Sequence, residues 1–409
     1  MDPTLIEFFN VVFRFVHIIA AIMWIGNSLL FTWMEINLIK DPESPQSLGH
    51  MNMLHAGGVF FLDKRIIDPA NIPPQLHVFR WQSYTTWLSG AALLILTFYT
   101  RSGTLLLDPS KSAMTGSEAM LVSAISIVLA WVVYDRVWKS PLRRRPALAI
   151  FTMVAALVGY TYWIDGFYNN RFVLLQIGAM MATTMTANVY FVIIPNQKKM
   201  MAALREGKPH DLELGKQAKL RSLTNHYVTF PVIFLMLSAH FPGIYSAPLY
   251  IPIVFVLMAS LVVIKHMMNI YLNFEEWLYV AVGTFVVGIG LTFMLLSLPD
   301  AIADPRDDSL LALSDDAIEG RRLVGAKGCV ACHQPIDSNM APSYYGIFNT
   351  ERKFADGTSV IADEAYLRES ILYPNRKIVA GYAPAMPGYA GAFSDQELNQ
   401  LIAYIMETK

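Results

Sequence analysis

The sequence is poor in cysteine and in charge. Only two of its 409 residues are cysteines, Cys329 and Cys332, and they lie three positions apart. This excludes a disulfide framework of the kind that holds small secreted domains together. Charged residues make up only 15% of the chain and hydrophobic residues 54%, whereas soluble domains have roughly 25% charged residues. Much of the chain is therefore expected to lie in membrane lipid.

Two further absences exclude common classes of function. The net charge is -1, so the chain lacks the basic surplus typical of proteins that bind nucleic acid. No glycine-rich dinucleotide fingerprint follows a predicted strand. We therefore expect neither a nucleic-acid partner nor a nicotinamide or flavin cofactor.

Apolar runs of about 20 residues, the length that crosses the hydrocarbon core of a bilayer, recur along the first three quarters of the chain. The eight runs cover residues 7–35, 80–100, 117–138, 147–165, 171–194, 225–241, 248–272 and 276–298. The first run is too long for a signal peptide, has acidic residues before it and lacks a small-residue cleavage site after it. The sequence therefore predicts an all-α fold, with an eight-helix transmembrane bundle over residues 1–298.

Basic residues in two connections set the expected orientation. The 139–146 loop holds four basic residues and no acid, and the 196–224 loop holds seven basic residues against three acids. Both loops should face the cytoplasm, so that eight spans leave both termini outside. A Pro- and Asp-containing linker is expected over 299–313, followed by a small polar domain over 314–409.

The C-terminal segment carries a C-x-x-C-H motif at residues 329–333. This spacing lets the thiols of Cys329 and Cys332 reach the two vinyl groups of one porphyrin, while His333 supplies a ligand to the iron. The alternative is a redox-active cysteine pair followed by a chance histidine. Lys327 and Gly328 before the motif, together with methionines after it, favour one covalent haem c on a small class I-like cytochrome c domain.

The sixth iron ligand should be a methionine, because no histidine follows His333. Met386 lies in a Pro-rich loop and is the expected ligand. Met340 is only seven residues from His333, and Met406 lies in a predicted final helix, 395–407, where a packing role is expected. A His–Met pair implies a fairly high potential, so a soluble cytochrome c or a terminal oxidase is the expected electron acceptor.

Polar and aromatic side chains mark the membrane runs at helical spacing. The first run holds Arg14, His17, Trp24, Ser28, Phe31 and Glu35, the sixth holds His226, Thr229, Met236 and His240, the seventh holds Lys265, His266 and Asn269, and His77 begins the second. Ionisable side chains inside a bilayer are costly and are usually functional. These stripes are therefore expected to face the interior of the bundle.

Two interpretations of the histidines stay open. Histidines from different helices hold haem inside helical bundles, so His17 and His240 could ligate a b-type haem in the outer half. His226 and His266 are further candidates near the inner end, and Arg14 would pair with a haem propionate or act with His17 on substrate. In the alternative, each histidine completes a polar network or a helix end.

The C-terminal domain is similar to a known group. Residues 328–333, 363–371 and 385–387 resemble the cytochrome c domain fused to some bacterial cytochrome c oxidase subunits II. That resemblance covers about 80 residues. The rest of the chain differs, because it has eight predicted spans and lacks the His-and-Cys copper cluster of that subunit.

The membrane portion resembles the membrane-bound urate hydroxylase family. The motifs that carry the resemblance are His17 with residues 24–28, then residues 55–58, 76–81, 85–90, 187–190, 194–197, 231–232 and 240–242. The chain departs from the family pattern at Ala56-Gly57-Gly58, where a three-glycine run is usual, and in the placement of His226. The resemblance implies an eight-span domain joined to cytochrome c, which oxidises urate to 5-hydroxyisourate and passes the electrons to the attached cytochrome.

The sequence therefore supports a membrane-bound oxidoreductase of the urate hydroxylase type, with urate or a quinone as its expected small-molecule partner. Since bacteria attach haem c in the periplasm, we expect a multi-pass protein of the bacterial inner membrane with its cytochrome c domain outside. The main rival is a non-catalytic, membrane-anchored electron-transfer subunit of a respiratory complex. A transporter is a weaker alternative, because covalent haem has no evident use there.

Overall fold

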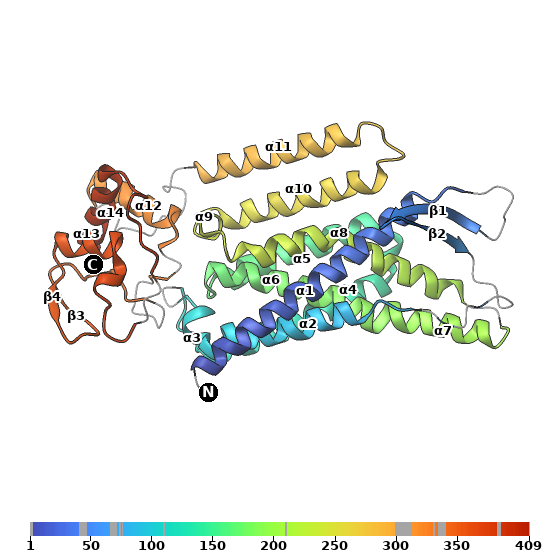
Figure 1. Cartoon of the computed structure of the whole chain (residues 1–409), viewed down its shortest axis with the longest axis horizontal. Coiled ribbons are helices and arrows are strands. Elements are labelled where there is room, and N and C mark those ends of the chain that lie inside the picture. Colours follow the sequence, from blue (N-terminus) through green and yellow to red (C-terminus); the bar gives the residue numbers. More distant parts are fainter. Residues whose placement is uncertain are drawn as a thin grey trace.

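The computed structural model is mostly helical (Figure 1). It describes residues 3–40, 47–65, 72, 75, 77–108, 111–208, 211–298, 313–329, 332–333, 341–382 and 386–408. Most of the expected linker, 299–312, lies outside the described residues.

The membrane portion is a bundle of long helices that run along a common direction (Figure 1). Its helices are α1 (Pro3–Ile36), α2 (Trp81–Leu93), α3 (Ser102–Leu105), α4 (Gly116–Lys139), α5 (Pro146–Asp165), α6 (Asn170–Ala187), α7 (Ile194–Arg205), α8 (Leu212–Ser238), α9 (Pro242–Tyr245), α10 (Tyr250–Ile270) and α11 (Trp277–Leu296). Short irregular helices extend or join them: η2 (Leu94–Phe98), η3 (Tyr99–Arg101), η4 (Pro141–Arg144) and η5 (Asn188–Ile193). Helix α1 packs on α2, α6 packs on α4 and α8, and α10 packs on α8 and α11.

Six helical segments among the described residues are long and apolar enough to cross a membrane. They are Leu5–Ile36, Gly116–Lys139, Pro146–Asp165, Asn170–Arg205, Tyr250–Ile270 and Trp277–Leu296. The expected count of eight is not confirmed. The run at 80–100 is helical, but α2 ends after 13 residues and the π-helix η2 follows it. The run at 225–241 is the second half of α8, whose first half is polar.

The two ends of the bundle differ. The N-terminus and the C-terminal domain lie at one end, and α7 lies toward the other (Figure 1). The expected loop at 196–224 is largely helical, because α7 and the first half of α8 occupy it. At the same far end, β1 (Ser47–His55) and β2 (Gly58–Arg65) form a hairpin that an all-α prediction did not include. Ala56 and Gly57 make its turn, both with positive φ.

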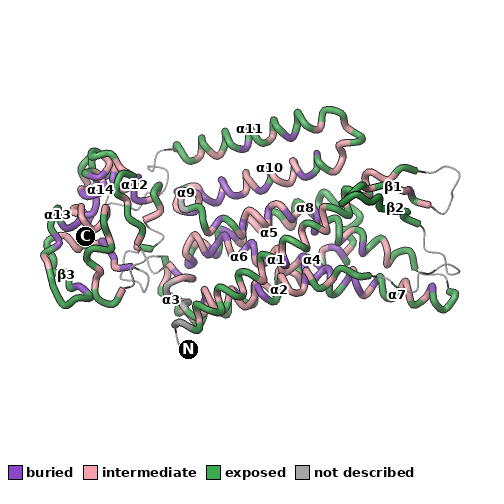
Figure 2. Tube along the Cα trace, in the orientation of Figure 1, coloured by how far each residue is buried: buried purple, intermediate pink, exposed green. Residues whose placement is uncertain are grey.

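The apolar core of the bundle lies at the end that faces the C-terminal domain (Figure 2). Tyr168, Phe172, Ile177 and Leu235 are fully buried there, where α4, α5, α6, α8 and α10 meet. Most residues of α1 and α11 are at least partly exposed (Figure 2). The central helices are thus packed on one another, and the outer helices are left to face lipid.

The C-terminal domain is built on the crossing of its first and last helices, α12 (Asp315–Ala326) and α14 (Asp395–Glu407). The helices approach so closely at Gly320 that a Cβ there would collide with the carbonyl oxygen of Gln400 and lie 2.9 Å from the Cβ of Tyr404. A short hairpin of β3 (Glu351–Lys353) and β4 (Ser359–Ile361) precedes α13 (Glu364–Leu372) and the turn η9 (Pro374–Arg376). Helix α12 also contacts α9 of the membrane bundle.

Candidate functional site

The turn around His333 positions its ring for metal binding. The backbone N–H groups of Cys332 and His333 both donate to the carbonyl of Cys329, at 3.2 and 3.0 Å. The Nδ1–H of His333 donates to the carbonyl of Pro342 at 2.6 Å. That bond selects the tautomer whose Nε2 lone pair is available to a metal. Burial lowers the pKa of His333, which also favours the neutral, ligating form.

The methionine candidates differ in their surroundings. Met386 is half-buried in the irregular segment before α14, directly after residues outside the described part of the chain. Met406 packs against the apolar core of the C-terminal domain from α14, as its expected structural role requires. Met340 lies outside the described residues. Met386 as iron ligand remains a prediction.

His17 contacts α2. Its Nδ1 lies 2.9 Å from the carbonyl oxygen of Thr86 and 3.2 Å from Oγ of Ser89. A Cβ at Gly90 would lie 2.9 Å from the ring carbon Cε1, so glycine lets the ring lie against the helix. Because a carbonyl can only accept, Nδ1 carries the proton and Nε2 keeps its lone pair.

The rest of the predicted stripe on α1 is only partly inside. Trp24 and Ser28 are half-buried, as is His17, whereas Arg14 is exposed. Glu35 is exposed and pairs with Lys64 of β2 at 2.9 Å. The middle of the stripe, from His17 to Ser28, is therefore half-buried, whereas its two ends, Arg14 and Glu35, are exposed.

His226 of α8 is buried and its ring contacts two other helices. Its Nε2 lies 2.8 Å from Oδ1 of Asn269 on α10, and its Nδ1 lies 3.4 Å from Oγ1 of Thr32 on α1. Both ring nitrogens are thus used within the protein. This arrangement supports the polar-network interpretation of His226.

The other histidine candidates lie at exposed positions. His266 is exposed on α10, and its Nδ1 lies 2.8 Å from the hydroxyl of Tyr227. His240 is exposed in the turn after α8, and His77 is exposed before α2. The structure gives His17 and His240 no mutual contact among the described residues, so their pairing through a haem stays a prediction.

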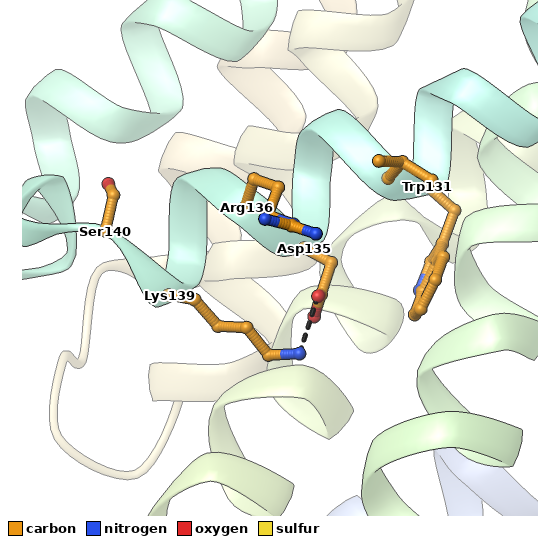
Figure 3. A pocket seen from close by; sticks show the side chains of 6 residues that line it. Trp131, Asp135, Arg136, Lys139 and Ser140 are labelled. Carbon is orange, nitrogen blue, oxygen red and sulfur yellow. Dashed lines mark ion pairs between the residues drawn. The ribbon is translucent and has the colours of Figure 1, made fainter.

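A buried ion pair lies in the half of the bundle away from the C-terminal domain. Asp135 of α4 accepts from Arg221 of α8 and from Lys139, both at 2.7 Å. Asp135 and Lys139 line a groove of about 750 Å³, together with Trp131, Arg136 and Ser140 (Figure 3). The indole Nε1 of Trp131 is buried without a hydrogen-bond partner in the described part of the chain.

Next to this pair lies an amide network that sequence reasoning did not identify. Asn188 donates to Oδ1 of Asn225 at 3.0 Å and to the hydroxyl of Tyr134 at 3.3 Å, and Asn225 donates to the carbonyl of Met185 at 2.9 Å. Polar residues of α8 recur every four positions, at 221, 225 and 229, and His226 lies next to Asn225. That periodicity is the signal that could have predicted a polar interior here.

Two family models divide the chain between them. The model described as urate oxidase N-terminal matches residues 3–296, and the cytochrome c model matches residues 317–409. The chain belongs to the urate oxidase N-terminal family. The expected resemblance to membrane-bound urate hydroxylases with a fused cytochrome c is thereby confirmed. No curated protein matches the chain.

This member of the urate oxidase N-terminal family has a cytochrome c domain, which implies haem c. The local geometry fits that group. Cys329 and Cys332 lie on one backbone turn, and His333 presents Nε2 because its Nδ1–H is held by Pro342. These residues would hold the haem, and Met386 stands as the proposed sixth ligand.

Proposed function

We propose that this protein is a membrane-bound oxidoreductase that converts urate to 5-hydroxyisourate and passes the electrons outward through its cytochrome c domain. The observation that carries the proposal is the fusion, in one chain, of the urate oxidase N-terminal module and a cytochrome c module. The reaction balances when urate and water give 5-hydroxyisourate, two protons and two electrons. Cys329 and Cys332 would hold haem c, which would supply a one-electron acceptor that takes the two electrons one after the other.

The proposed setting is the bacterial inner membrane, with eight spans and the cytochrome c domain in the periplasm. Two features support it. The N-terminus lies at the same end of the bundle as the C-terminal domain, as an even number of spans requires (Figure 1). The basic residues Arg143, Arg144 and Arg145 follow α4 in η4 and begin α5, at the far end, which is the cytoplasmic end by the positive-inside rule. A soluble cytochrome c or a terminal oxidase would then accept the electrons outside.

His17 is the proposed ligand of a b-type haem within the bundle. Its Nδ1–H is held by Thr86, which leaves Nε2 for a metal. The contact between Thr32 and His226 sets the relative depth of α1 and α8. His17 lies 15 residues outward from that contact on α1, about 22 Å at 1.5 Å per residue, and His240 follows the outer end of α8 by two residues, so both lie toward the outer end of the bundle. His17→Ala should remove a b-type absorbance and leave the c-type spectrum; purified protein with only c-type haem would contradict this ligation.

The proposed reaction is tested with purified full-length protein under anaerobic conditions. Added urate should reduce haem c and yield 5-hydroxyisourate, and the Cys329→Ala/Cys332→Ala variant should yield no product with external cytochrome c. The matched control is a chemical reductant, which should reduce haem c in the wild-type protein without urate. If urate leaves haem c oxidised while a quinol reduces it, the protein is a non-catalytic electron-transfer subunit instead.

A further inference from the structure

One buried charge in the bundle lacks a counter-charge. Asp135, Arg221 and Lys265 are each only 4% exposed. Asp135 and Arg221 neutralise one another at 2.7 Å. Lys265 of α10 has neither an ion pair nor a hydrogen bond within the described part of the chain, and its ammonium lies 5.4 Å from the ring centroid of Phe230 on α8. A buried cation of this kind is costly unless something compensates it.

The surroundings of Lys265 are neutral and polar. Lys265 and Asn269 are one turn apart on α10, and His226 and Phe230 are one turn apart on α8. The two pairs face one another, since His226 bonds to Asn269 at 2.8 Å and Lys265 lies over the ring of Phe230. Thr32 of α1 closes the group at 3.4 Å from His226. Three helices thus bring one cation, one aromatic ring, an imidazole and an amide together.

These groups match a planar heterocyclic anion better than an inorganic one. An ammonium neutralises the anion, and an aromatic ring offers a face for stacking. His226 holds Oδ1 of Asn269, so that the NH₂ group of this amide can donate hydrogen bonds to carbonyl oxygens and ring nitrogens. We propose that Lys265, Phe230 and Asn269 form the binding site for the urate anion, and that His226 positions Asn269. This inference rests on the proposed function and gives it a substrate site.

The site lies in the half of the bundle away from the cytochrome c domain. His17 lies 15 residues outward from Thr32 on α1, about 22 Å at the helical rise. Lys265 is therefore a binding residue that is separate from the proposed haem-ligating histidine.

Equilibrium dialysis of radiolabelled urate against the oxidised full-length protein tests the site. Lys265→Met should raise the Kd for urate at least about tenfold, because it removes a charge-assisted contact. Phe230→Leu keeps the charge and should weaken binding less. Lys216→Met, an exposed lysine paired with Glu213, is the matched control and should bind as the wild type does. Hypoxanthine, an uncharged purine, should bind weakly and equally to the wild type and to Lys265→Met, because neither comparison involves a charge on the ligand.

A thermal melt without urate separates a binding role from a structural one. Lys265→Met should melt at the same or a higher temperature than the wild type, because it removes an uncompensated charge. Urate should raise the melting temperature of the wild type and leave that of the variant unchanged. A lower melting temperature for the variant, together with unchanged urate affinity, would show that Lys265 is structural and overturn the site.

The outcomes distinguish this inference from the proposed function. Urate-dependent reduction of haem c with a KM that is insensitive to Lys265→Met overturns the site and leaves the function standing. Urate binding that depends on Lys265 but leaves haem c oxidised supports the site and contradicts the function. A wild-type protein that binds no urate overturns the site.

Discussion

The cytochrome c domain and the membrane bundle assemble their polar groups in opposite ways. In the C-terminal domain, both cysteines and the proximal histidine lie within five consecutive residues of one turn. In the bundle, His226 meets Asn269 from 43 positions away and Thr32 from 194 positions away. The chemistry of a local motif can be predicted from contiguous residues, whereas the chemistry of the bundle depends on which helices pack together.

The two regions can also be observed separately. All eight tryptophans lie between Trp24 and Trp277, in the membrane portion. Tryptophan fluorescence therefore reports on the bundle, and the absorbance of haem c reports on the C-terminal domain. If the two regions are independent, substitutions in one region should leave the signal of the other unchanged.

The largest effect is expected at the haem-attachment turn. Replacing Cys329 and Cys332 together with alanine should abolish all covalent haem, because no other cysteine is present to form a thioether. The measurement is haem staining after denaturing electrophoresis, and the tryptophan melt of the bundle should stay as in the wild type. Covalent haem in the double variant would contradict the attachment site, and a collapsed bundle would break the separation of the two regions.

The next effect is expected at the buried ion pair of the bundle. Asp135→Asn should destabilise the bundle by about 3–5 kcal/mol, because it leaves Arg221 as an uncompensated buried charge. The tryptophan melt measures it, with an unchanged haem c spectrum. Glu35→Gln is the matched control, since the Glu35–Lys64 pair is exposed and should contribute less than about 1 kcal/mol. Equal effects at the two sites would contradict the burial argument.

A smaller effect is expected where the helices of the cytochrome c domain cross. Gly320→Ala should destabilise that domain by about 1–3 kcal/mol, because the new Cβ collides with the backbone of Gln400. Gly325→Ala on the same helix is the control, because a Cβ there meets nothing within 4 Å and should gain up to about 1 kcal/mol of helix propensity. Denaturation followed at the haem absorbance checks both, and a neutral Gly320→Ala would show a looser crossing.

The smallest effect concerns acid stability of the same domain. A hydrogen bond from Lys377 holds the pKa of Glu369 below its usual value of 4.5. A carboxyl with a lowered folded-state pKa stabilises the fold above its unfolded pKa and loses that contribution as the pH falls through the folded value. The haem-monitored melting temperature should therefore fall below about pH 4.5, and less steeply in Glu369→Gln. Identical pH profiles would show that this ion pair contributes nothing.

The sequence allowed the long helices, the haem-attachment motif and the family to be predicted, because each depends on local periodicity or contiguous residues. The β1–β2 hairpin escaped prediction because Ala56 occupies a positive-φ turn position that usually carries Asn or Gly. The 196–224 segment was taken for a loop because charge masks its helical pattern, and α8 continues through it.

The candidate site in the bundle was only partly predictable. Lys265, His226 and Asn269 stood out as polar residues in apolar runs, but their meeting depends on the packing of α8 against α10. The same holds for Asp135 and Arg221, whose pairing joins α4 to α8. A single sequence does not show which helices contact one another, because the pattern of each helix shows only that one of its faces is polar.

The central claim, that urate oxidation in the bundle delivers electrons to the cytochrome c domain, is tested most directly by anaerobic mixing of oxidised full-length protein with a limiting amount of urate. Haem absorbance and 5-hydroxyisourate are recorded together. The account predicts that two haem equivalents are reduced for each urate consumed. If the haem stays oxidised in urate while a chemical reductant reduces it fully, the account is contradicted.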